Sequence, residues 1–482
     1  MVAESRGYTP AVSRTDAIVA TLIVYKLAMI AIGVVANRLA KTETDYFLGG
    51  RRLGPGVAAL SASASSSSVW TLIGVSGYAY GFGLAAIWLL PACVGGFVLN
   101  WYVLAPGLRK LAREREAITV TEVLAGPPGS EHRRAVIVLA SVIILLSLVT
   151  YVAAQFQGAG QAFAETFDMR FEIAVVIGAG IVVFYTLLGG FWAVSLTDTI
   201  QGLMMVFAAI ALPVVAVAKL GVVGLGHSLV PEGIGVWAAA TQGLGPAAAL
   251  GFVLGLLGIG LGYPGQPHVV NRFMALRDEQ SVVTGRRIAL SWAVVIYAGM
   301  IVLGWAMRVL IPELPGREDA FVASTEHLLP PVLAGIMVAA LLSAIMSTAD
   351  SQLLVAASTV SHDLLGGAGE RSASDRTLLR SRSTVLGLAV AAVLVALCVD
   401  ETIFSSVLFA WTAMGSAFGP VLLVTVVRRR PGSAWVLAAM SMGFALSVAA
   451  HLWPLSKGGA LERVAPFVVA LALSWIGARR AR

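Results

Sequence analysis

The feature that most constrains this chain is a series of long apolar segments, one after another along almost its whole length. A helix that crosses a bilayer needs roughly 20 predominantly apolar residues, and thirteen segments approach or exceed that length. We therefore predict an all-α membrane protein with thirteen transmembrane helices, in one polytopic domain that covers 1–482. The segments are 16–36, 55–79, 84–107, 135–163, 171–189, 193–218, 246–270, 287–310, 331–361, 384–400, 403–427, 433–452 and 464–478.

The composition agrees with this class and excludes several others. Only 12% of the residues are charged, about half of the roughly 25% found in soluble domains, which argues against a soluble enzyme, a disordered protein or a nucleic-acid binder. Cys93 and Cys398 both lie in apolar runs, which predicts buried thiols without a disulfide framework. No metal-ligand pattern, hydrolase triad or phosphate loop is recognisable, so we predict a protein that is not an enzyme. The lipid bilayer is its expected partner, and nothing indicates an obligate protein partner.

The positions of the basic residues predict an orientation. With the N-terminus outside, the inner loops and the C-terminus hold 24 of the 33 Lys and Arg residues, the outer side holds eight, and Lys26 lies inside the first span. Cytoplasmic loops of membrane proteins carry such an excess. We therefore predict a multi-pass protein of the plasma membrane with a cytoplasmic C-terminus.

Two segments have the composition of broken helices. The first, LGPGVAALSASASSSSVWTLIGVSG over 53–77, is rich in serine, and the second, LGLLGIGLGYPGQP over 254–267, is rich in glycine and proline. Each opens a group of five spans, at 55–218 and 246–427, with 16–36 as an extra first helix and 433–478 as two last helices. Short or interrupted spans at matching positions in two halves are typical of transporter binding sites. The alternative for each single Gly or Ser is close helix packing, but the matched pair favours a central binding site.

Polar residues within the spans add candidate site residues. Asp198 and Asp350 are costly at membrane depth, although Asp198 lies near a span end, where an interfacial or structural carboxylate is an equal alternative. Ser347 shares a helical face with Asp350 and Ser351. Hydroxyl, carbonyl and carboxylate oxygens suit a hard cation, so this cluster, facing the serine-rich broken helix, is a candidate Na⁺ site. Its alternative is simple bonding of the hydroxyls to helix carbonyls.

Three further polar residues have two interpretations each. Lys26, in the middle of the first span, either extends to the interface or pairs with a neighbour. His268 and Arg272, after the second broken helix, form either an inner gate or a solvated helix end.

At these residues the sequence resembles the sodium:solute symporter family, and within it the sodium/proline symporters most closely. The resemblance extends from about residue 16 to 478 and includes the thirteen-span layout. Four stretches carry it: DYFLGGRRLGP (45–55), GGFWAVSLTDTIQ (189–201), LGYPGQPHVVNRFMA (261–275) and MSTADSQLL (346–354).

The resemblance implies a fold and a set of roles. The fold would be a leucine-transporter-like five-plus-five inverted repeat behind the extra first helix. The family's sodium site would lie on the carbonyls of Ala64, Ser67 and Ala344 and on the hydroxyls of Ser347 and Thr348. Asp198 matches a family acid on the ion's route to the cytoplasm, with Asp350 and Ser351 as accessory positions. The solute would contact Trp70, Tyr263 and Pro267.

Two positions depart from the pattern of sodium/proline symporters. Ser66 stands where those carriers have an Asp in the first broken helix, and Ile259 stands where they have a Trp in the second. The first change removes a charge that matters for sodium, and the second reshapes the solute pocket. One hypothesis is that Asp350 supplies the missing carboxylate near the ion.

We therefore predict a secondary active symporter that uses Na⁺ as coupling ion and imports a small organic solute by alternating access. Proline or a related amino acid is the first candidate solute. Pantothenate, a monocarboxylate or a choline-like solute is the alternative, and a solute sensor without transport is the weaker one.

Overall fold

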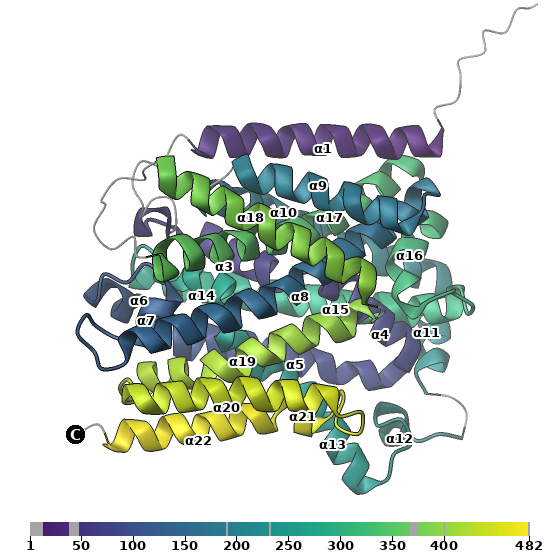
Figure 1. Cartoon of the computed structure of the whole chain (residues 1–482). Coiled ribbons are helices and arrows are strands. Elements are labelled where there is room, and N and C mark those ends of the chain that lie inside the picture. Colours follow the sequence, from purple (N-terminus) through teal and green to yellow (C-terminus); the bar gives the residue numbers. More distant parts are fainter. Residues whose placement is uncertain are drawn as a thin grey trace, which may run out of the picture.

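The computed structural model describes residues 13–37, 48–188, 191–230, 233–365, 375–399 and 401–480, and these residues are almost entirely helical (Figure 1). Eleven helices among them are long and apolar enough to cross a membrane. The principal helices are α1 (Arg14–Asn37), α3 (Pro55–Ser66), α4 (Val75–Phe82), α5 (Leu89–Val98), α6 (Ala105–Glu114), α7 (Val120–Ala125), α8 (Arg133–Phe167), α9 (Phe171–Leu188), α10 (Phe191–Leu220), α13 (Pro246–Leu257), α14 (Pro267–Met274), α15 (Glu279–Leu310), α17 (Pro331–Ser358), α18 (Asp375–Cys398), α19 (Ile403–Val427), α20 (Ser433–Leu452), α21 (Ala460–Arg463) and α22 (Ala465–Arg480).

The all-helical membrane architecture is confirmed, whereas the count of thirteen stays a prediction. The predicted span 55–79 is divided between α3 and α4, and the long apolar stretch Trp70–Glu114 runs from its second half into the next span. The predicted span 171–189 forms α9, whose apolar part is the shorter Phe171–Phe184. The segment between α10 and α13 contains two short helices, α11 (Val222–Leu229) and α12 (Val236–Ala240).

Two helices begin well before the apolar segments that predicted them. The segment starting at 287 belongs to α15, which begins at Glu279, and the segment starting at 384 belongs to α18, which begins at Asp375. Hydropathy marks only the part of a helix that lies in lipid, whereas polar turns continue the helix beyond it. The start of α15 is fixed by Asp278, whose carboxylate accepts a hydrogen bond from the backbone N–H of Ser281 at 2.7 Å.

Two helices of the bundle, α17 and α19, are buried on nearly all sides, and other helices form two opposite flanks. In Figure 1, α1 lies along one flank and α20 and α22 along the other. The apolar stretches of α17 and α19 are 83% and 89% buried, against 22% for that of α1. Polar side chains on a helix that is buried on nearly all sides contact other protein groups and not lipid. α17 and α19 are therefore suited to line a site.

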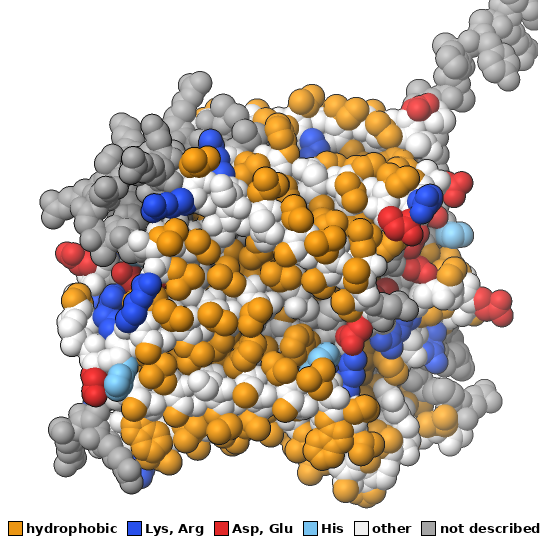
Figure 2. All heavy atoms as spheres, viewed as in Figure 1, with side chains coloured by type: hydrophobic (Ala, Val, Ile, Leu, Met, Phe, Trp, Pro, Cys, Tyr) orange, Lys and Arg blue, Asp and Glu red, His pale blue; other side chains and the backbone are white. Residues whose placement is uncertain are grey.

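The outer face of the bundle is suited to lipid. Figure 2 shows hydrophobic side chains over the middle of the molecule, and acidic and basic side chains gathered toward the two ends of the long helices. Large apolar side chains such as Val24, Leu146, Phe184 and Val214 are more than half exposed. A soluble protein rarely exposes so large an apolar surface, so this band is the part of the surface that faces the hydrocarbon.

Both helices that were predicted to be broken are broken. α3 ends at Ser66, because Ser67 leaves helical geometry (φ −117°, ψ 57°), and helical structure resumes at Trp70. α13 ends at Leu257 and is followed by a 3₁₀ segment over Gly258–Gly265. The chain is then extended at Gln266 before α14 begins with Pro267.

Glycines at the second break also allow close packing, as the alternative interpretation held. A Cβ on Gly262 would lie 2.1 Å from the Trp411 ring of α19. A Cβ on Gly260 would lie 2.3 Å from the carbonyl oxygen of Ala92 on α5. No residue larger than glycine fits at either position. The break and the tight packing therefore both require glycine here.

Backbone hydrogen bonds join the residue that precedes α3 to the residues that follow α14. The N–H of Leu53, just before α3, donates to the carbonyl of Ala275 at 3.1 Å, and the N–H of Arg277 donates to the carbonyl of Leu53 at 3.1 Å. The Arg113 guanidinium donates to the carbonyl oxygens of Leu276 and Arg277 on the same side. The start of α3 is therefore coupled to the end of α14.

Candidate functional site

The first break exposes backbone groups that neighbouring helices satisfy. The N–H of Val69 donates to Oε1 of Gln155 on α8 at 3.1 Å, and the N–H of Trp70 donates to the Ser68 hydroxyl at 3.2 Å. The Tyr151 hydroxyl donates to the same Ser68 oxygen at 3.4 Å. An unwound segment at membrane depth requires such partners, and α8 provides them.

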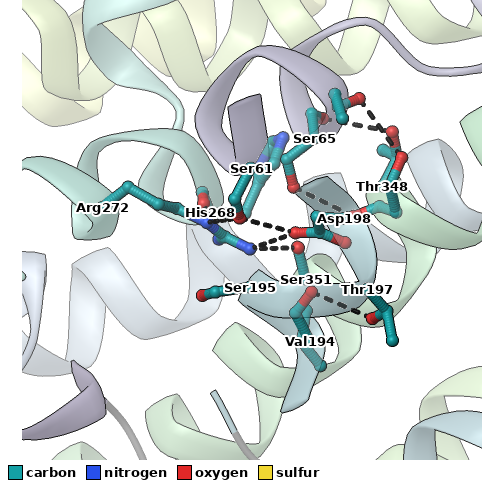
Figure 3. A network of polar contacts seen from close by, with 12 residues as sticks. Ser61, Ser65, Val194, Ser195, Thr197, Asp198, His268, Arg272, Thr348 and Ser351 are labelled. Atoms are coloured by element: carbon teal, nitrogen blue, oxygen red, sulfur yellow. Dashed lines mark hydrogen bonds and ion pairs between the residues drawn. The ribbon is translucent and has the colours of Figure 1, made fainter. Parts of the chain in front are cut away.

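The serine-rich helix meets α17 through alternating hydroxyls and carbonyls. The Ser347 hydroxyl lies 3.3 Å from the carbonyl oxygen of Ala64 and 3.2 Å from that of Ala344. The Thr348 hydroxyl donates to the carbonyl of Ser65 at 3.1 Å, and the Ser65 hydroxyl donates to the carbonyl of Ser347 at 3.0 Å. Figure 3 shows Ser65 and Thr348 pointing toward each other from the two helices.

Four of the five residues predicted for sodium are therefore close together. Ala64, Ala344, Ser347 and Thr348 are all fully buried and present neutral oxygens, which are ligands that a hard cation accepts. The fifth, Ser67, lies at the break, where its backbone N–H donates to the carbonyl of Ala64 at 3.2 Å. Its hydroxyl lies 3.3 Å from the Tyr297 hydroxyl of α15. The donor set fits a monovalent cation without a carboxylate.

An aromatic cluster connects the second break to the first. The hydroxyls of Tyr263 and Tyr297 lie 2.7 Å apart, and the Trp70 ring is edge-on to Tyr297, with 6.1 Å between centroids. The Trp411 indole N–H donates to the carbonyl of Ile259 at 3.1 Å, and its ring is edge-on to Tyr263 at 4.7 Å. Three of the predicted solute-contacting residues, Trp70, Ile259 and Tyr263, therefore lie in one buried cluster.

The two other predicted solute-contacting positions have different surroundings. Pro267 is buried as the first residue of α14, where a missing N–H costs nothing. The Ser66 hydroxyl donates back to the carbonyl of Ser63 at 2.9 Å within its own helix. Near the first break, the Trp70 indole nitrogen and the Thr71 hydroxyl are buried without a hydrogen-bond partner. Such orphaned atoms are available to a solute or a water molecule.

Asp198 belongs to a charged network at the inner side of the site (Figure 3). Its carboxylate lies 3.0 Å from the Arg272 guanidinium of α14, and both side chains are almost completely buried. The Ser61 hydroxyl of α3 donates to the same carboxylate oxygen at 2.7 Å, and Arg272 donates to the Ser351 hydroxyl of α17 at 2.5 Å. One arginine thus links α3, α10, α14 and α17, as an inner gate would.

Asp350 faces away from the predicted sodium ligands. Its carboxylate accepts a hydrogen bond from Thr186 on α9, and its second oxygen is buried without a partner. The Lys26 ammonium of α1 attracts it electrostatically and contacts Met346 one turn away. The neighbouring Tyr25 hydroxyl lies 2.7 Å from the Ser343 hydroxyl. The extra first helix therefore contributes two polar side chains to the side of α17 that carries Ser343 and Asp350.

Several residues of the site were not identified from the sequence. The helices that contact the breaks have the composition of ordinary apolar spans. Their contacting residues are Gln155, Tyr151, Tyr297 and Trp411. Gln155 is a polar residue inside a span, which was a usable signal. The aromatic residues gave no signal, because aromatic side chains in a span are usually packing residues. A structural role for Asp198, paired with an arginine, was one alternative, but the sequence did not identify Arg272 as the partner.

Comparison with known proteins gives a consistent result. The sequence profile of the sodium:solute symporter family matches residues 46–443. The sodium/proline symporter of Escherichia coli (strain K12) is 35% identical over 435 residues, which cover 88% of this chain and 85% of that protein. The osmoregulated proline transporter OpuE of Bacillus subtilis (strain 168) is 34% identical over 467 residues, covering 94% of this chain and 93% of that protein.

Solved structures share the fold. A Na⁺-coupled sialic acid symporter in a substrate-bound outward-open state superposes with a TM-score of 0.78 at 19% sequence identity. The superposition covers 96% of this chain and 98% of that one. A nucleobase-cation-symport-1 family transporter in a closed conformation has a TM-score of 0.58 at 15% identity. These similarities extend over whole chains and not only over a shared motif.

Proposed function

This chain belongs to the sodium:solute symporter family, and we propose that it imports proline or a related amino acid together with Na⁺. The observation that carries the proposal is the contact between α3 and α17, where Ser347 lies 3.3 Å from the carbonyl oxygen of Ala64. This contact supplies neutral oxygens from two helices at a break. The relatives named sodium/proline symporter and proline transporter support the solute class.

The proposed sodium ligands are the carbonyls of Ala64, Ser67 and Ala344 and the hydroxyls of Ser347 and Thr348. In the structure the Ser347 hydroxyl lies within hydrogen-bond distance of two of these carbonyls, those of Ala64 and Ala344, and the Thr348 hydroxyl donates to the carbonyl of Ser65. A cation attracts oxygen lone pairs, so the hydroxyls would rotate and the ion would take over the role of the protons. Binding would then hold α3 against α17 and order the unwound segment after Ser66.

The proposed solute site is the aromatic cluster beside that segment. Trp70, Tyr263 and Ile259 are buried around the two breaks, with Ser66 and Pro267 at their edges. The cluster is apolar with a few orphaned donors, which suits a small zwitterion with a hydrocarbon ring. Solute and ion need only prefer the same conformation for their binding to be coupled.

The inner tie between Arg272 and Asp198 is the proposed gate. When it opens, α3 and α14 would move together, because their inner ends share backbone hydrogen bonds. Asp198 and Ser351 would then face the ion on its way to the cytoplasm. We propose that the two five-helix groups 55–218 and 246–427 are the inverted repeats that provide this motion. The N-terminus would lie outside, as the distribution of basic residues favours.

The driving force is sufficient for accumulation. One Na⁺ moving inward gains roughly 2.3 kcal/mol per 100 mV of membrane potential, which corresponds to about fifty-fold accumulation of a neutral solute. The sodium concentration ratio adds to this. Another sodium-coupled solute, such as pantothenate, a monocarboxylate or a choline-like cation, is the second candidate, because Ser66 and Ile259 change the family's pocket.

Uptake into proteoliposomes tests the proposal. Radiolabelled proline, other amino acids, pantothenate and short carboxylates are compared under an inward sodium gradient and under a matched potassium gradient. We expect saturable proline uptake only with sodium. Binding without flux would indicate a sensor, and the absence of sodium-dependent uptake of any solute in the panel would contradict a symporter.

A further inference from the structure

A buried arginine lies beside the broken helices without an acidic partner. Arg463, the last residue of α21, is only 7% exposed. Its guanidinium makes one hydrogen bond, from Nη1 to the carbonyl of Gly255 at 3.3 Å, and its Nε is buried without a partner. In the described part of the chain no carboxylate lies within ion-pair distance of it. Glu462 attracts the guanidinium electrostatically but forms no direct ion pair with it. A buried charge normally has a counter-charge in contact, so the guanidinium has room for an anion.

The adjacent acidic residue is occupied elsewhere. The Glu462 carboxylate accepts a hydrogen bond from Nδ1 of His451 at 2.7 Å and another from the backbone N–H of Gly458. His451 belongs to α20, and Gly458 lies in the loop that precedes α21. Glu462 therefore stabilises the loop, and Arg463 remains available to an external anion.

Arg463 is positioned against the second break. A Cβ on Gly258, the first residue after α13, would lie 3.0 Å from the Arg463 Cβ and 3.2 Å from its carbonyl oxygen. The next residue, Ile259, is the one whose carbonyl binds Trp411. The arginine therefore lies where the second helix unwinds.

An aromatic wall connects Arg463 to the first break. Its guanidinium carbon lies 6.0 Å from the centroid of the Phe404 ring. Phe404 stacks on Tyr78 with centroids 4.7 Å apart and lies 5.7 Å from Trp70, one of the proposed solute-contacting residues. Phe404 therefore lies near both the guanidinium and the proposed solute cluster.

We propose that Arg463 binds the carboxylate of the transported solute and makes this carrier selective for carboxylate-bearing solutes. A guanidinium recognises a carboxylate through paired, charge-assisted hydrogen bonds, and Arg463 has unused donors for them. Arg272, the buried arginine of the inner network, is already bound to Asp198. The inference rests on the proposed function and narrows it. Proline, pantothenate and monocarboxylates carry the required group, whereas choline-like solutes do not.

A purely structural role makes a different prediction. If Arg463 only caps the carbonyl of Gly255 at the end of α13, its loss would weaken the fold and affect all solutes equally. A carboxylate-binding role affects acids and leaves their amides unchanged. The comparison of an acid with its amide therefore separates the two roles.

The experiment uses L-proline and L-prolinamide on the full-length protein. Initial uptake of proline and its inhibition by each compound are measured for the wild type, R463Q, R463K and the control R170Q, which removes an exposed arginine of the α8–α9 loop. We expect R463Q to raise the KM for proline by about 10–100-fold with little change in the maximal rate. The inhibition constant of prolinamide should change less than threefold, R463K should be intermediate, and R170Q should match the wild type.

Thermal unfolding of the purified protein gives a second readout that needs no transport. Its midpoint without solute reports folding, and the shift with proline, prolinamide or propionate reports binding. If the wild type does not transport proline but is stabilised by a carboxylate through Arg463, the solute assignment fails and this inference holds. If R463Q weakens the thermal shifts with the acid and with the amide equally, Arg463 is structural and the inference is overturned. The same conclusion follows if R463Q prefers the acid over the amide as strongly as the wild type does.

Discussion

The guanidinium of Arg272 and the carboxylate of Asp198 lie 3.0 Å apart, fully buried, although 74 residues separate them in the chain. The pair joins the inner end of the second broken helix to α10. The same arginine reaches Ser61 and Ser351. In the proposed transport cycle, these are the contacts that separate when the gate opens.

Breaking this pair is expected to impair both folding and transport. Arg272→Gln leaves an uncompensated buried carboxylate and should destabilise the protein by about 3–5 kcal/mol. Asp198→Asn should destabilise the protein by a similar amount, because it leaves the buried Arg272 guanidinium without its counter-charge. The double variant should cost less than the sum of the two, because neither charge is then left alone. Thermal unfolding and uptake of all three variants test this, and additive effects would refute a direct pair.

The hydroxyls of α17 are expected to set the sodium requirement. The double variant Ser347→Ala, Thr348→Ala should lose sodium stimulation of uptake, with at least a tenfold rise in the sodium concentration for half-activation, because two of the five proposed ligands are removed. Ser343→Ala on the same helix is the control, since its hydroxyl binds Tyr25 and the carbonyl of Ala339. Equal sodium responses of the double variant and the wild type would exclude this cage.

The role of Asp350 is tested by a neutral replacement. If Asp350 supplies the carboxylate that Ser66 lacks, Asp350→Asn should weaken sodium dependence while uptake at high sodium persists. Thr186→Val, which removes the hydrogen bond to the carboxylate, is the control for a local packing effect. Unchanged sodium activation in Asp350→Asn would end the hypothesis.

The glycines of the second break should be intolerant of a methyl group only where packing is tight. Gly262→Ala places a Cβ 2.1 Å from the Trp411 ring, and overpacking of this kind typically costs 1–3 kcal/mol. Gly251→Ala, on the neighbouring α13, meets nothing within 4 Å and should be neutral or slightly stabilising. The thermal midpoints of the two variants give the comparison, and similar values would contradict the observed packing.

The contact between α7 and the helical segment Thr359–Leu364, which follows α17, should be acid-sensitive. Burial alone would raise the pKa of Glu122. The hydrogen bond and charge of His362 and the N–H groups of Ile118 and Thr119 outweigh burial and hold this pKa below its ordinary value of 4.5. A carboxylate with a lowered pKa stabilises the folded state above its ordinary value, and that contribution is lost as the pH falls through the lower value.

Glu122→Gln should therefore lower the thermal midpoint at pH 7 and flatten its decline below about pH 4.5. Glu131→Gln, which removes a highly exposed carboxylate nearby in the sequence, should leave the pH profile unchanged. Parallel profiles for Glu122→Gln and the wild type would show that Glu122 contributes nothing to acid sensitivity.

Much of the architecture was predictable from the sequence because lipid imposes simple requirements. The predicted spans 403–427 and 433–452 coincide with α19 and α20, since apolar length and loop residues define both ends. The two breaks were predictable because runs of serine and of glycine with proline are unfavourable in helices. The starts of α15 and α18 were not, because their first turns are polar and leave no hydropathy signal.

The sequence by itself determined the membrane class, the two broken helices and the residue types able to bind sodium, because each depends on local composition or spacing. Only the tertiary structure decided which polar groups meet: Ser347 with Ala64, Arg272 with Asp198, and Asp350 with Thr186 and not with the proposed sodium ligands. It also left Arg463 buried beside the second break without a carboxylate. The residues of these three pairs are 74 to 283 positions apart in the chain, and helix packing, which no local pattern encodes, brings them together.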